Sequence, residues 1–152
     1  MTMMQKVQAK KSKKGFTLVE LVIVIAILAI LAAIAIPVIT TTINSSKMSV
    51  MESDCATVNM LVKEAINNQQ AGIATTTYAG VAATSKSTLT ISHVLAENNL
   101  PSGTDFFTRQ IGGSTYNMVA ISTNGLTISV QAGGTALTGG QNIASLAAAA
   151  GL

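Results

Sequence analysis

The sequence predicts an α+β protein, in which a long N-terminal α-helix is followed by a head that contains a small antiparallel β-sheet. Two observations support this fold class. An apolar run near the N-terminus continues into an amphipathic segment that ends near Asn67, which indicates one long helix. Further along, two segments rich in β-branched residues flank Asn124-Gly125, a dipeptide that favours a tight hairpin turn. We expect the helix to be half transmembrane and half packed on the head.

The first half of the predicted helix has almost no charge. Glu20 is the only ionisable side chain in residues 16–46. As a helix, residues 16–39 would extend about 36 Å, enough to cross a hydrocarbon core of about 30 Å. Eleven of the sixteen residues in 21–36 are Ile, Leu or Val, and they contribute about 3 to 7 kcal/mol toward membrane insertion. A buried charge costs about 2.5 to 3.5 kcal/mol, so insertion is favoured even with Glu20 included.

Basic residues are concentrated before Gly15. Five of the nine lysines and arginines lie in residues 1–15, and the remaining chain has four basic against six acidic residues. The basic character therefore belongs to a leader segment, and we predict no nucleic-acid surface. By the positive-inside tendency, the leader stays in the cytoplasm and residues after 39 lie outside a single membrane span.

Glu20 needs a counterion, because an ionisable group in a membrane normally pairs with another charge. Residues 16–46 contain no second ionisable side chain. Cleavage between Gly15 and Phe16 would create a positive α-amino group at Phe16. We hypothesise that this amine on one subunit neutralises Glu20 on its neighbour as the apolar helices pack together.

The chain closely resembles type IV prepilins over residues 13–37, which read KKGFTLVELVIVIAILAILAAIAIP. The resemblance implies a pilin-like fold, cleavage after Gly15 by a prepilin peptidase and N-methylation of Phe16. It also implies that Glu20 acts in subunit assembly and that Pro37 bends the helix. The chain has one cysteine, so the C-terminal disulfide of many pilins cannot form, and in this respect it looks more like pilins of Gram-positive bacteria.

The expected organisation is a leader peptide at 1–15, a transmembrane and assembly helix at 16–39, and a head at 40–152. The resemblance implies a structural subunit of a type IV pilus, or fimbrium, that self-associates into a helical filament. Its partners would be the prepilin peptidase, the pilus assembly platform and its ATPase machinery. The subunit would be held in the cytoplasmic membrane before assembly and lie in a cell-surface pilus afterwards, with cell adhesion and twitching motility among the possible roles.

Several alternatives remain open at this stage. A secretory signal peptide could be cut after Ala35, since Ala33-Ile34-Ala35 is an A-x-A site. A plain single-pass anchor would explain the length of the apolar run but not Glu20. A pseudopilin of a type II secretion or DNA-uptake system shares the same expected fold. The last alternative is a membrane-anchored binding module that never polymerises.

The head is predicted from three patterns. The helix should bury a stripe made of Met48, Met51, Cys55, Val58, Val62 and Ile66. The hairpin should run from Tyr116 to Thr123 and from Leu126 to Gln131, with a type I′ turn, Ile121 opposite Ile128 and Val119 opposite Val130. Short helices are expected at 92–98 and 142–150, and an irregular surface connection at 71–87.

No catalytic, cofactor-binding or metal-binding residue is predicted, and we expect no enzymatic activity and no cofactor. His93 has no nucleophile or metal ligand at a useful spacing, so a surface or helix role is expected. Cys55 belongs to the apolar stripe, where a buried thiol is inert. Glu52 and Asp54 lack the further oxygen ligands that a calcium loop requires.

Overall fold

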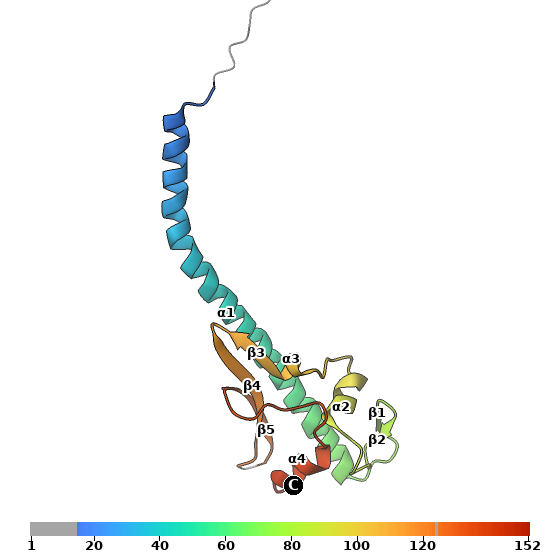
Figure 1. Ribbon diagram of the computed structural model, residues 1–152. Helices are drawn as coiled ribbons and strands as arrows, with labels where there is room; N and C mark the ends of the chain where they lie inside the picture. Colours follow the sequence, from blue (N-terminus) through green and yellow to red (C-terminus); the bar gives the residue numbers. More distant parts are fainter. Residues whose placement is uncertain (1–14, 124) are drawn as a thin grey trace, which may run out of the picture. The chain divides into compact units, whose positions relative to one another are not determined.

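The computed structural model describes residues 15–123 and 125–152 (Figure 1). The chain divides into two compact units, one ending at Thr40 and the other spanning Thr41–Leu152. Helix α1 (Leu18–Gln70) contributes to both units. This is the α+β, pilin-like architecture that the sequence predicts, with a long apolar helix followed by small antiparallel sheets. The predicted leader lies outside the described residues except for Gly15.

The first unit consists of the start of α1 and the residues just before it. Every described residue from Gly15 to Thr40 is exposed. Pro37 lies inside the helix, where it removes one backbone hydrogen bond. Within the described chain, α1 is long and apolar enough to cross a membrane by length and composition.

The second unit forms a core along one face of the remaining part of α1. Of the predicted stripe, Met48 is partly buried and the other five members are buried. Leu61, Ala65 and Gln69 extend this face toward the end of the helix. A spacing of three and four residues places these side chains on one side of a helix, so the predicted stripe is confirmed.

Strands β3 (Thr108–Ile111), β4 (Ser114–Ile121) and β5 (Thr127–Ala132) form an antiparallel sheet in the order β3-β4-β5. Helix α3 (Thr104–Phe107) leads directly into β3 and buries Phe107 in the core. At the edge strand β5, the backbone N–H of Ile128 donates to Asn59 Oδ1 on α1 at 3.0 Å. This bond fixes the sheet edge to the helix.

The predicted register of the β4–β5 hairpin is wrong by one residue. Ile128 pairs with Ala120 and Val130 pairs with Met118. Five residues separate the strands, and Leu126 leaves the ladder to be buried in the core. Because neighbouring residues of a strand point to opposite faces, the shift places Met118 in the core instead of Val119. The predicted turn type depends on Asn124, which lies outside the described residues.

The segment 71–87 is more ordered than expected. It contains a two-stranded hairpin, β1 (Thr77–Tyr78) and β2 (Val81–Ala82), which closes through Ala79 and Gly80 at positive φ. The Asn68 side chain donates to Tyr78 Oη at 2.8 Å and that of Gln69 to the Ala83 carbonyl at 3.3 Å. These bonds hold the hairpin on the end of α1. Short strands without alternating hydrophobicity explain why the sequence pattern missed them.

Helices α2 (Ile91–Glu97) and α4 (Ile143–Ala149) confirm the two predicted short helices. Their starts are joined by an antiparallel bridge between Thr90 and Asn142. Asn142 caps α4, because its Oδ1 accepts from the N–H groups of Ala144 and Ser145. At the other end, Gly151 takes a positive φ of 73° and terminates the helix, as predicted.

Candidate functional site

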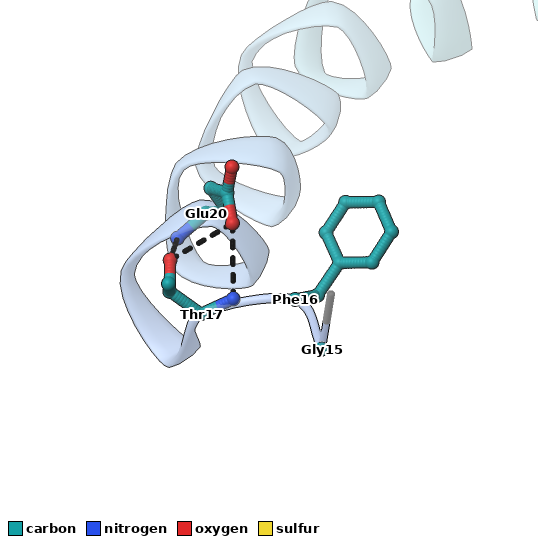
Figure 2. Close-up of a pocket in the computed structure, with 4 residues that line it drawn as sticks. All are labelled: Gly15, Phe16, Thr17 and Glu20. Carbon is teal, nitrogen blue, oxygen red and sulfur yellow. Dashed lines mark hydrogen bonds between the residues drawn. The ribbon is translucent and has the colours of Figure 1, made fainter. Parts of the chain in front are cut away.

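The candidate site lies at the N-terminus of α1. Gly15, Phe16, Thr17 and Glu20 line one shallow open hollow there (Figure 2). Three of the four predicted site residues are therefore neighbours in the structure, whereas Pro37 lies further along the same helix. The fourth residue of the hollow, Thr17, was not among the predicted site residues.

Thr17 and Glu20 form a reciprocal capping arrangement. The backbone N–H and the hydroxyl of Thr17 both donate to Glu20 Oε2, each at 2.9 Å. In return, the backbone N–H of Glu20 donates to Thr17 Oγ1 at 3.2 Å. These bonds satisfy groups that have no partner inside the helix, because the first amides of a helix lack a preceding carbonyl. Thr17 therefore fixes where α1 begins.

Glu20 consequently has local hydrogen-bond partners that were not predicted from the sequence. Its carboxylate is turned back over Thr17, and it lies in the first turn, where the helix dipole favours negative charge (Figure 2). The signal was present as the pattern T-x-x-E in Thr17 to Glu20. Hydrogen bonds leave the net charge of the group in place, so the need for a positive counterion in an apolar environment persists.

The residues at the predicted cleavage point are accessible. The Phe16 side chain is 88% exposed, and its ring points away from Glu20 (Figure 2). Gly15 is exposed, and a Cβ built on it would meet nothing within 4 Å. Gly15 and Phe16 also precede the first residue of α1. A protease therefore meets an uncrowded, non-helical backbone at this position.

Residues after the capping turn present only apolar side chains up to Thr40. The large ones among them are 49% to 64% exposed. Such a surface is stable in lipid or against other apolar helices, but not in water. The site is thus a capped, negatively charged turn at the start of a bare apolar helix, and this arrangement suits packing against neighbours.

Other candidate residues have structural roles. His93 Nδ1 accepts from the N–H of Thr90 at 3.2 Å and lies 2.7 Å from its hydroxyl, so it caps α2 as a helix role requires. Cys55 is buried, and burial, followed by the nearby Glu52 carboxylate, raises the pKa of its thiol. Asp54 accepts a hydrogen bond from Arg109 at 2.6 Å. Each of these contacts lies within the head.

Comparison with known proteins gives one match. Residues 10–36 carry the prokaryotic N-terminal methylation motif, which is the leader signature of type IV pilins and prepilins. The motif covers less than a fifth of the chain and includes Gly15, Phe16 and Glu20. No curated protein and no solved structure matches the chain.

The motif and the fold together support a type IV pilin-like protein, a class that includes pilins and pseudopilins. The motif implies processing by a prepilin peptidase and assembly into a pilus-like system. Together with the apolar helix, it indicates anchoring in the membrane before assembly. The proteins that carry this motif are structural subunits.

Proposed function

We propose that this chain is a structural subunit of a type IV pilus. It is cleaved after Gly15, N-methylated at Phe16 and polymerised through its apolar helix into a helical filament on the cell surface. The domains proposed are a leader at 1–15, an assembly helix at 16–39 and a head at 40–152. The observation that carries the proposal is the methylation motif at the start of a helix segment that is exposed throughout.

Extraction from the membrane is the main energetic constraint on such a subunit. Moving residues 16–39 out of lipid exposes their apolar side chains unless other helices bury them again. Neighbouring copies offer equivalent apolar helices. A head-to-tail contact that does not close into a ring produces an open helical array, so self-association into a filament satisfies the constraint.

Glu20 would set the axial offset between subunits. The proposal pairs its carboxylate with the Phe16 amine of a neighbouring copy, which becomes available only after cleavage. A misplaced subunit would leave both charges unpaired in an apolar environment, and that is costly. The ion pair thereby selects one stagger among the many that apolar packing alone would allow.

The test separates the charge of Glu20 from its capping role. Glu20→Gln keeps an oxygen that can accept from Thr17 but removes the charge, whereas Thr17→Val removes the hydroxyl and keeps the charge. Sheared surface fractions of cells producing each variant would be examined by electron microscopy, beside cells that lack the chain. We expect fibres from the parent chain and Thr17→Val, and severe loss with Glu20→Gln.

Two results would overturn parts of this proposal. Cells producing the parent chain could form no fibres and retain the processed subunit in the membrane. That result would reject the surface pilus and favour a pseudopilin role in secretion or DNA uptake. Normal fibre yield from Glu20→Gln would remove the ion pair as the device that sets the stagger.

A further inference from the structure

The part of α1 that belongs to the head has a second face, beside the core stripe and outside the buried core. The spacing of three and four residues selects Ile43, Ser46, Val50, Ser53, Thr57 and Met60. We call these six residues the outer seam. Its three large apolar side chains, Ile43, Val50 and Met60, are 47%, 53% and 61% exposed, although the buried stripe on the same helix already supplies the core.

Charge is excluded from the outer seam. The charged residues between 43 and 63 are Lys47, Glu52, Asp54 and Lys63, and all four fall at other positions. The next position of the repeat is Glu64, which ends the seam. A helix face that only meets water gains solubility from charge. An uncharged strip between charged flanks instead matches a contact with another apolar helix.

Two of the three hydroxyl groups of the seam already donate hydrogen bonds within α1. Ser46 Oγ donates to the Thr42 carbonyl at 2.9 Å, and Thr57 Oγ1 donates to the Ser53 carbonyl at 3.0 Å. Burying a hydroxyl without a hydrogen-bond partner costs free energy. Because these two donate to their own helix, a partner helix can cover them without leaving a donor unsatisfied. Their small size also lets a second helix approach closely.

We propose that the outer seam packs against helix α1 of a second copy of this chain. This inference rests on the proposed function, because assembly through residues 16–39 brings the apolar helices of neighbouring copies alongside each other. Ile39, the last residue of that segment, is the preceding position of the same repeat. The contact between subunits therefore continues past the membrane segment as far as Met60.

Cysteine labelling tests this contact. In a Cys55→Ala background, Ser53→Cys places a thiol on the seam, and Glu52→Cys places a matched exposed thiol one residue away and off the seam. Each protein is labelled with a membrane-impermeant maleimide, both in sheared fibres and as subunits dispersed in detergent. We expect assembly to slow labelling of Ser53→Cys about tenfold or more and that of Glu52→Cys by less than about twofold, because thiol reactivity requires access.

A charge substitution gives a second measurement. Ser53→Lys should reduce fibre yield about tenfold while leaving the processed subunit in the membrane, because the lysine would lose its hydration against an apolar helix. Glu52→Lys should assemble as the parent does. If the parent forms fibres in which Ser53→Cys labels as fast as Glu52→Cys, or Ser53→Lys assembles normally, the seam contact is wrong. If the parent forms no fibre at all, the proposed function fails, and this contact fails with it.

Discussion

Single residues determine where α1 begins. Thr17 satisfies the first amides of the helix together with Glu20. Thr17→Val should therefore loosen the first turn, whereas Thr17→Ser keeps the hydroxyl that accepts from the Glu20 amide. Hydrogen exchange of the Glu20 amide in detergent micelles measures how firmly the first turn is held in each variant. We expect faster exchange in Thr17→Val only, and equal protection in both variants would show that the cap does not hold the turn.

Cys55 makes the stability of the head depend on pH. Burial raises the pKa of its thiol, so folding favours the neutral form. Below the pKa of an unfolded thiol, about 8.5, this contribution is complete, and it is lost as pH rises through that value toward the raised pKa of the folded protein. Urea unfolding at pH 7 and about pH 9.5 should show a smaller loss of stability in Cys55→Ala than in the parent. An identical loss in both proteins would remove Cys55 as the cause.

Ala79 lies in the left-handed region with a φ of 46°, which strains an alanine. Ala79→Asn should raise the free energy of unfolding by about 0.5 to 1 kcal/mol, because asparagine tolerates this conformation better. Ala79→Val should lower it, because a β-branched side chain suffers most there. Denaturant titration of both variants measures whether the free energy of unfolding rises or falls relative to the parent. A destabilising asparagine would mean that the Ala79 side chain makes a contact that offsets the backbone strain.

At the scale of elements, the register of the β4–β5 hairpin has the clearest consequence. Met118 is buried on the core face, and Ile121 is half-buried on the opposite face. Met118→Ala should destabilise the head by about 2 to 5 kcal/mol, and Ile121→Ala by about 1 kcal/mol. Urea titration of the two variants ranks them. The reverse order would support the register that the sequence predicts.

Long patterns were predictable and short ones were not. The α1 stripe from Met51 to Ile66 follows from repeated spacing over several turns, and burial confirms it. The hairpin register depends on whether Leu126 joins the ladder or the core, which is decided by packing against α1 and not by the dipeptide at the turn. At the site, the motif residues are visible in the sequence. Thr17 was not predicted, because the unpaired charge of Glu20 calls for a counterion. A hydrogen-bond partner three residues away does not neutralise that charge.

For the whole molecule, the division after Thr40 predicts separable behaviour. All the buried core residues of the described chain lie between Met51 and Ala147, inside the second unit. A fragment comprising residues 41–152 should fold as a soluble monomer with a cooperative unfolding transition, and it should form no fibre. Sedimentation and calorimetry of the fragment measure both properties. Fibre formation by this fragment would show that α1 before Thr41 is dispensable for assembly.

Processing after Gly15 and assembly through the helix that follows are central to the proposed function. Intact-mass and N-terminal analysis of the mature protein from cells tests this processing most directly. We expect a chain that begins at Phe16 and carries one methyl group on its α-amine. An unprocessed N-terminus, or a chain that begins at Ile36 after cleavage behind Ala35, would contradict it.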